Sequence, residues 1–201
     1  MRKILLASNN PGKVREIQTL LKDDDITIVP QSAFQIPNIE EIGLTFIENA
    51  ILKARHASQL SGLPAIADDS GLEVDALDGA PGVISARYAG PGASDTDNNA
   101  KLLRELEKIP NAERTARFRC VMVFLRHARD PSPLIGQGVW EGIILNEPRG
   151  SGGFGYDPLF FVPEKNCTSA ELTPDEKNRL SHRSKALREL VAQLCALRNE
   201  G

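Results

Sequence analysis

The stretch that most constrains the fold is Ala116–Leu145, which reads ARFRCVMVFLRHARDPSPLIGQGVWEGIIL. It contains two runs rich in β-branched, aromatic and aliphatic residues, 116–126 and 134–145, and each run predicts a long strand. The Pro-Ser-Pro sequence at 131–133 predicts a turn between them. We therefore expect two neighbouring, antiparallel strands here.

The segments on either side of this pair mix strand and helix patterns. Thr45 and Glu48 form a capping-box pattern that begins a helix, and Gly62 ends it. Two more helices are predicted at 95–109 and from Ser181 onward. Short apolar runs predict buried strands at 3–7, 26–29, 65–67 and 159–162. This mixture predicts an α/β fold with a mixed sheet covered by helices, in one domain of 201 residues with no linker.

Composition excludes several classes of protein. Hydrophobic residues make up 41% and charged residues 25%, which is typical of a globular domain and not of a disordered chain. The apolar runs are too short for a membrane span or a signal peptide. A net charge of -3 argues against a protein that binds duplex nucleic acid. Because Cys120, Cys167 and Cys195 form no CxxC pair, we expect neither a zinc site nor a disulfide framework. We therefore expect the protein to be located in the reducing cytoplasm.

The first candidate for chemistry is the stretch from Ser8 to Lys13. A strand, a polar turn and a helix N-terminus follow one another here, and free backbone N–H groups at such a point bind anions. Lys13 adds a mobile positive charge, although the GxxxxGK[ST] pattern of a P-loop is absent. The alternative is an ordinary turn in which Asn10 caps the helix.

The second candidate is the acidic pair Asp68-Asp69, which follows an apolar strand. That strand runs into residues 68–71, and the alternating pattern of Leu72–Leu77 continues as strand. Adjacent carboxylates repel each other unless a cation or hydrogen bonds compensate, and Mg²⁺ prefers such oxygen ligands. One interpretation of Asp68-Asp69 is metal binding or acid–base catalysis, and the other is a polar turn. Glu40 and Glu41 could supply a second metal ligand, or they could form a solvated strand face.

The third candidate is the glycine-rich stretch SGGFGYDP at 151–158. Phe154 and Tyr156 could stack on a planar base, or they could fold into the core. Further along the chain, Arg183 could donate paired hydrogen bonds to a carbonyl or a phosphate. His182 beside it has the pattern of an ordinary residue near a helix start.

Taken together, these segments resemble the nonstandard-purine nucleoside triphosphate pyrophosphatases, also called inosine/xanthosine triphosphate pyrophosphatases. The resemblance covers essentially the whole chain. It is carried by six motifs in order: Ser8-x-Asn10-x-x-Lys13, Gly43 to Ala50 with Lys53-Ala54, Ala67 to Leu72, Gly79 to Tyr88, Gly153 to Pro158, and Glu176 to Asn178 with Ser181-His182-Arg183.

The resemblance implies an elongated mixed α/β fold whose two lobes enclose a central active-site cleft. It also implies a homodimer that depends on Mg²⁺ and acts on a purine nucleoside triphosphate. The reaction would be hydrolysis of ITP, dITP or XTP to the nucleoside monophosphate and pyrophosphate. Nucleic acid and membranes are not expected partners.

The resemblance also assigns roles to residues. Asp69 would be the general base and a Mg²⁺ ligand, supported by Asp68, and Glu40 would be the second ligand with Glu41 as its alternative. Lys53 would help to neutralise the phosphates. The other expected substrate contacts are Ser8, Asn9, Asn10, Pro11, Gly12, Lys13, Ser70, Phe154, Gly155, Tyr156, Asp157, Lys177, His182 and Arg183.

Three other classes compete with this interpretation. A nucleotide sensor without hydrolytic activity would have no need of Asp68 and Asp69. A pyrophosphatase of the Maf-like septum-inhibitor type would have a signature resembling Ser-x-x-Arg-Arg at its start, where Asn10 to Lys13 stand here. A module that binds single-stranded nucleic acid through stacking is disfavoured by net acidity and by an aromatic content of only 5%.

Overall fold

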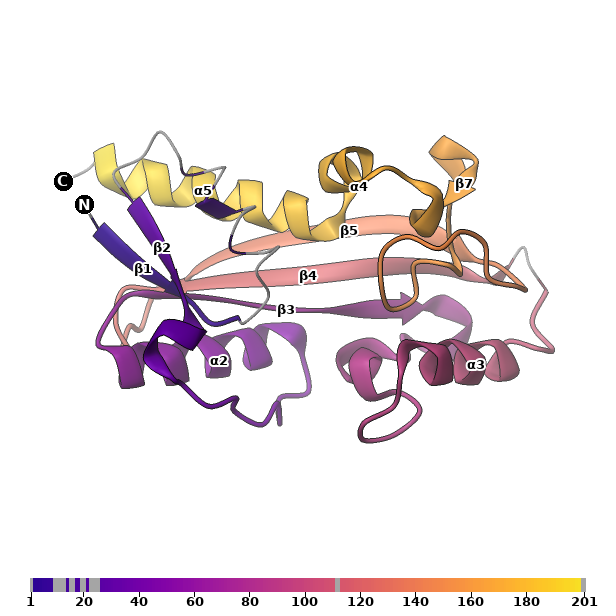
Figure 1. Cartoon of the computed structure of the whole chain (residues 1–201), viewed down its shortest axis with the longest axis horizontal. Helices are drawn as coiled ribbons and strands as arrows, with labels where there is room; N and C mark the ends of the chain where they lie inside the picture. Colours follow the sequence, from indigo (N-terminus) through magenta and orange to yellow (C-terminus); the bar gives the residue numbers. More distant parts are fainter. Residues whose placement is uncertain are drawn as a thin grey trace. The chain divides into compact units, whose positions relative to one another are not determined.

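A computed structural model describes residues 2–8, 14, 17, 18, 21, 26–110 and 113–199 (Figure 1). The strands described are β1 (Arg2–Leu6), β2 (Ile26–Pro30), β3 (Ala65–Val74), β4 (Thr115–Leu125), β5 (Leu134–Ile144), β6 (Phe160–Val162) and β7 (Cys167–Thr168). The α-helices described are α2 (Phe46–Ser61), α3 (Asp95–Glu105), α4 (Pro174–Leu180) and α5 (His182–Asn199). Short 3₁₀ helices occupy Gln31–Phe34, Asp75–Leu77, Gly82–Arg87, Pro163–Lys165 and Ser169–Glu171.

The strands form one sheet in the order β2-β1-β3-β4-β5-β6-β7. β1 pairs in parallel with β2 and β3, whereas β6 pairs antiparallel with β5 and β7. The predicted mixed α/β fold is therefore confirmed. The two long strands predicted within Ala116–Leu145 are β4 and β5, which are neighbours in the sheet as expected. Within the described part of the chain, none of the helices combines the length and apolar character needed to cross a bilayer.

The chain divides into two compact units. The first comprises Met1–Asp69, Cys120–Gly138 and Lys185–Gly201, and the second comprises Ser70–Arg119 and Val139–Ser184. The boundaries fall inside β3, β4, β5 and α5, so these elements contribute residues to both units.

The first unit has apolar clusters on both sides of its strands. Because neighbouring side chains of a strand point to opposite faces, β1 contributes side chains to both clusters. Leu5 packs with Ala57 of α2, and Ile4 and Leu6 pack in the cluster that contains Leu187 of α5. In Figure 1, α2 and α5 accordingly lie on opposite sides of the strands.

Helix α2 starts and ends as its sequence signals predict. The hydroxyl of Thr45 accepts from the backbone N–H of Glu48 at 3.3 Å, and the Glu48 carboxylate accepts from the N–H of Thr45 at 2.8 Å. Gly62 closes the helix in the left-handed conformation, with a φ of 70°. The buried residues of the helix are Phe46, Asn49, Ala50, Ala54, Ala57 and Ser58.

Of the two interpretations of Asp68-Asp69, the polar turn is not what the structure shows. β3 runs without interruption from Ala65 to Val74, and Asp68 and Asp69 are buried within it. In a polar turn, the Asp69 carboxylate would bond to nearby backbone N–H groups. Here side chains of α2 bond to Asp69, so the backbone can stay extended. The strand then ends earlier than predicted, and Leu77 lies in a 3₁₀ helix.

The core of the second unit is centred on aromatic side chains. The ring of Phe118 lies 4.5 Å from that of Phe160 and 6.5 Å from that of Trp140, measured between centroids. Leu102 of α3 and Tyr156 belong to the same buried cluster. The burial of so many large side chains stabilises the position of the loop that contains Tyr156.

Gly136 allows α5 to approach β5 closely, and this contact gives a stability prediction. A Cβ added to Gly136 would lie 2.2 Å from the backbone oxygen of Ala186. Because backbone atoms cannot move away as a side chain can, we expect Gly136→Ala to lower the free energy of unfolding by about 1–3 kcal/mol. Urea denaturation measures this loss. Gln137→Ala, at the exposed neighbouring position, is the control, and equal stabilities for the two variants would contradict the packing argument.

Candidate active site

The first unit contains a cationic side chain that bridges two carboxylates. Asp69 shares a face of β3 with Ala65 and Ala67, because alternate residues of a strand point the same way. Lys53 extends from α2, and its Nζ lies 2.9 Å from Oδ1 of Asp69 and 2.7 Å from Oε1 of Glu41. Asn49, one helical turn before Lys53, donates from Nδ2 to Oδ2 of Asp69 at 3.3 Å.

Burial shapes the acid–base properties of this group. Burial raises the pKa of Asp69 above its usual value, and the nearby Lys53 and Asn49 lower it only in part. Burial also lowers the pKa of Lys53, but the charges and hydrogen bonds of Asp69 and Glu41 outweigh that effect and raise it. Asp69 is thus a stronger base than an exposed carboxylate while it keeps a cationic partner.

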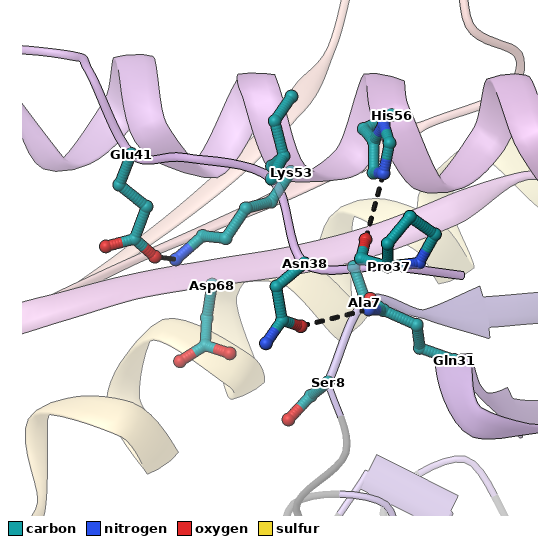
Figure 2. A pocket seen from close by; sticks show the side chains of 10 residues that line it. Ala7, Ser8, Gln31, Pro37, Asn38, Glu41, Lys53, His56 and Asp68 are labelled. Atoms are coloured by element: carbon teal, nitrogen blue, oxygen red, sulfur yellow. Dashed lines mark hydrogen bonds and ion pairs between the residues drawn. The ribbon is translucent and has the colours of Figure 1, made fainter. Parts of the chain in front are cut away.

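A pocket of about 390 Å³ lies beside the bridged carboxylates, all within the first unit. Figure 2 shows Lys53, Glu41 and Asp68 around it, together with Ser8 from the end of β1. The pocket is further lined by Ala7, Gln31, Pro37, Asn38, Ile39 and His56. A pocket that combines an ammonium group with carboxylates can accept a phosphate anion and a cation together.

The position of Glu41 bears on the choice between the two adjacent glutamates. Glu41 is half-buried and contacts Lys53, whereas Glu40 is exposed. Among the residues that the structure describes, no group of three or more His, Cys, Asp or Glu side chains is arranged to hold a metal ion by itself. The metal-ligand role expected for Glu40 and Asp69 stays a prediction.

The expected phosphate-binding stretch is described only at its first residue. Ser8 lines the pocket, with its backbone N–H bonded to the carbonyl of Leu6 at 2.8 Å. Asn9, Asn10, Pro11, Gly12 and Lys13 lie outside the described residues. Their role as substrate contacts stays a prediction.

The second unit brings together an exposed aromatic ring and two cations. Phe154 is 59% exposed. The Nζ of Lys177 lies 4.9 Å from the centre of its ring, and the guanidinium carbon of Arg183 lies 5.8 Å from it. Arg183 also donates to the hydroxyl of Ser70 at 3.4 Å. Four of the residues expected to contact substrate therefore lie in one cluster.

Asp157 holds this cluster in place. Its carboxylate is buried, forms an ion pair with Lys177, and accepts from the N–H of Phe154 at 2.8 Å. It also accepts from the hydroxyl of Ser169 at 2.9 Å. With Gly153 and Gly155 in the left-handed conformation, the loop turns tightly enough to leave the Phe154 ring exposed.

Two of the predicted contact residues are packed into the core. Tyr156 is buried and its hydroxyl donates to the carbonyl of Ser85 at 2.8 Å, which is the folded-in alternative that the sequence left open. The ring of His182 stacks on Phe118 at 4.9 Å between centroids. Of the two aromatic residues in the loop, Phe154 has the exposed ring, on which a planar base could stack.

Sequence reasoning missed several residues of the first-unit site. His56 was not among the expected site residues, yet it lines the pocket and contacts the carbonyl of Pro37 at 2.9 Å. Asn49 was singled out only as part of a motif, and its contact with Asp69 was not foreseen. The one signal in the sequence is an amide four residues after the capping residue Thr45 and one helical turn before Lys53.

The fold and the charged pocket define an α/β protein with a site suited to anions and cations, and comparison with known proteins narrows this class. A model of the Ham1 family matches residues 4–193. A dITP/XTP pyrophosphatase of Vibrio parahaemolyticus is 61% identical over 196 residues, which are 98% of each chain. A dITP/XTP pyrophosphatase of Thioalkalivibrio sulfidiphilus is 62% identical over 96% of this chain and 98% of the relative.

Solved structures agree with these matches. A HAM1 protein from Coxiella burnetii superposes with a TM-score of 0.94, at 52% identity, over 98% of this chain and 100% of that one. The Ham1 protein of Staphylococcus aureus superposes with a TM-score of 0.89, at 40% identity, over 97% of this chain and 99% of that one. The chain belongs to the Ham1 family.

The ion pair between Lys53 and Asp69 yields a prediction about stability and pH. Lys53→Met removes the partner that offsets burial, so the pKa of Asp69 should rise further. An acid whose folded pKa exceeds its unfolded value costs stability as the pH rises through the interval between the two. We therefore expect a loss of about 3 kcal/mol in the free energy of unfolding at pH 7, and a clearly smaller loss at pH 4.

Urea denaturation at both pH values measures this difference. Lys53→Met/Asp69→Asn is the matched control, because it has no carboxylate at position 69 and its stability relative to Asp69→Asn should change little with pH. A loss that is equal at pH 4 and pH 7 in Lys53→Met would show that the buried charge of Asp69 is not its source.

Proposed function

We propose that the protein hydrolyses nonstandard purine nucleoside triphosphates, namely ITP, dITP and XTP, to the nucleoside monophosphate and pyrophosphate. The observation that carries the proposal is the carboxylate pair bridged by Lys53 beside a pocket, in a chain about 60% identical to dITP/XTP pyrophosphatases along nearly its whole length. Such an enzyme would remove noncanonical nucleotides from the precursor pool.

Charge is the central difficulty of this reaction. A triphosphate repels an approaching nucleophile, so cations must offset its negative charge. Lys53 lines the pocket and supplies one such cation, and we assign Lys13 and the backbone N–H groups after Ser8 to the same task. Asp69, whose pKa is raised by burial, accepts a proton from the attacking water.

The donor set in the first unit fits Mg²⁺. This ion commonly takes one or two carboxylates and completes its shell with water and substrate phosphates, so a cluster of three protein ligands is not required. We propose that Asp69 and Glu41 hold it, with Asp68 beside them. We prefer Glu41 to Glu40, the second ligand that the family resemblance implies, because Glu41 and Asp69 both form an ion pair with Lys53. Bound Mg²⁺ would neutralise charge on the phosphates.

The cluster around Phe154 is suited to bind the purine base of the nucleotide. An exposed ring flanked by cations can stack on a purine with little regard to its identity. Choice among purines then requires directed hydrogen bonds, and the guanidinium of Arg183, which lies beside the Phe154 ring, can donate them. A 6-oxo purine presents an acceptor to such donors, and adenine presents an amino group.

The proposal also includes a cytoplasmic homodimer, as the family resemblance implies. Cys120, Cys167 and Cys195 are odd in number and form no CxxC pair in the sequence, which supports a reducing compartment. Light scattering coupled to size exclusion measures the mass, which should be twice 21.9 kDa.

The general-base assignment predicts the behaviour of Asp69→Asn. The substitution keeps the size of the side chain and removes the proton acceptor, so turnover of dITP should fall by about 10² to 10⁴-fold while the fold stays intact. Activity is measured with separate assays for pyrophosphate and orthophosphate, and folding by circular dichroism. A folded variant with half of the wild-type rate would exclude Asp69 as the base, and orthophosphate as the first product would exclude the proposed reaction.

Base choice provides a separate prediction. We expect kcat/KM for ITP, dITP and XTP to exceed that for ATP by about 10⁴-fold, because adenine would set donor against donor and leave a buried polar group unpaired. Arg183→Ala should reduce this ratio if the guanidinium recognises position 6 of the purine. Equal kcat/KM values for ITP and ATP in the wild type would refute the nonstandard-purine assignment. An unchanged ratio in Arg183→Ala would move the recognition of position 6 to another group.

A further inference from the structure

Asn49 is a buried amide with a specific place in the first unit. Its side chain has no exposed surface, although it lies near the start of α2 beside exposed residues such as Glu48. Full burial of an amide is unfavourable unless its hydrogen bonds are made. The contacts of Asn49 therefore explain why an asparagine stands here.

The hydrogen-bond network fixes which way the amide faces. The backbone N–H of Gly43 donates to Oδ1 of Asn49 at 2.7 Å. Since an N–H group requires an acceptor, this contact places the oxygen toward Gly43 and the NH₂ group toward Asp69. Nδ2 then donates to Oδ2 of Asp69 at 3.3 Å, while Lys53 binds Oδ1. Both oxygens of the Asp69 carboxylate are thus held, and the carboxylate cannot rotate freely.

The other end of the amide holds the segment that contains Glu41. Residues 36–43 have no regular secondary structure, so side chains must keep this segment in place. Gln31 donates to the carbonyl of Ile36 at 3.0 Å and His56 contacts the carbonyl of Pro37 at 2.9 Å. Asn49 binds the segment at Gly43, two residues from Glu41.

We propose that Asn49 is the positioning residue of the site: one amide orients the Asp69 carboxylate and fixes the segment that brings Glu41 to Lys53. This inference rests on the proposed function, in which Asp69 is the base. Asn49 itself contacts neither the substrate nor the attacking water. Its effect should appear in the rate of the chemical step, because small displacements of a base reduce turnover more than binding.

Gly43 provides an independent way to disturb the same contact. A Cβ at position 43 would lie 2.7 Å from Oδ1 of Asn49 and 2.7 Å from Cβ of Glu48. Its φ lies outside the left-handed region, so alanine suits the backbone and the cost comes from this close approach. Gly43→Ala should therefore push the amide of Asn49 away from its partners.

The test measures kcat and KM for dITP with Mg²⁺ in Asn49→Ala, Gly43→Ala and the double variant. We expect kcat to fall by about 10² in Asn49→Ala and by about tenfold in Gly43→Ala, with KM within about threefold of the wild type. The double variant should be no slower than Asn49→Ala alone, because both substitutions break one linkage.

Ser58→Ala is the matched control. Ser58 is also buried on α2 and donates to the carbonyl of Leu63 at 2.7 Å, but it belongs to the opposite end of the helix from Asn49. Its loss should reduce stability by a similar amount while kcat stays unchanged. A matching fall of kcat in Ser58→Ala would show that general destabilisation of α2, and not positioning, reduces the rate.

Other outcomes would also overturn the inference. A kcat within twofold of the wild type in folded Asn49→Ala, in a protein whose Asp69→Asn variant is inactive, would exclude the positioning role and leave the proposed function standing. An active Asp69→Asn variant would instead exclude Asp69 as the base and so remove the premise of this inference, whereas orthophosphate as the first product would refute the proposed function. Multiplying effects in the double variant would show that Gly43 and Asn49 act separately. If Asn49→Ala does not fold, Gly43→Ala decides, and an unchanged kcat there overturns the proposal.

Discussion

A carboxylate buried inside a strand must be compensated by groups from another element, and this requirement organises the first unit. Asp69 lies in the middle of β3, and α2 supplies two of its partners, the side chains of Lys53 and Asn49. These two residues are one helical turn apart and so lie on one face of the helix. The position of α2 along the sheet is therefore coupled to the orientation of a single carboxylate.

The same burial that costs stability provides chemical reactivity. Removing water around Asp69 raises its pKa and makes it a stronger base at neutral pH. It also raises the free energy of the charged carboxylate in the folded protein. Asp157 in the second unit shows a different solution. It is also buried, yet Lys177, the N–H of Phe154 and the hydroxyl of Ser169 all bond to it. A carboxylate held by so many donors fixes the shape of a loop.

Local signals in the sequence predicted most elements of the fold, and long-range contacts decided what they missed. The capping residues Thr45 and Gly62 place α2 correctly because caps act within a few residues. The choice between a polar turn and a functional role for Asp68-Asp69 stayed open in the sequence because the partners of Asp69 lie 16 and 20 residues away in the chain. For the same reason a strand pattern could not predict the contact between Glu41 and Lys53, which lie 12 residues apart in the chain.

The two units carry different chemistry. Carboxylates and an ammonium group gather in the first, and an aromatic ring with two flanking cations gathers in the second. A nucleoside triphosphate has the same division, with charge on its phosphates and a flat π-surface on its base. Under the proposed function, the base-recognising loop could change its hydrogen-bond donors without altering Asp69, Asn49 or Lys53. Selectivity for a base and the rate of hydrolysis would then be separable properties, because they depend on groups that share no hydrogen bond among those described above.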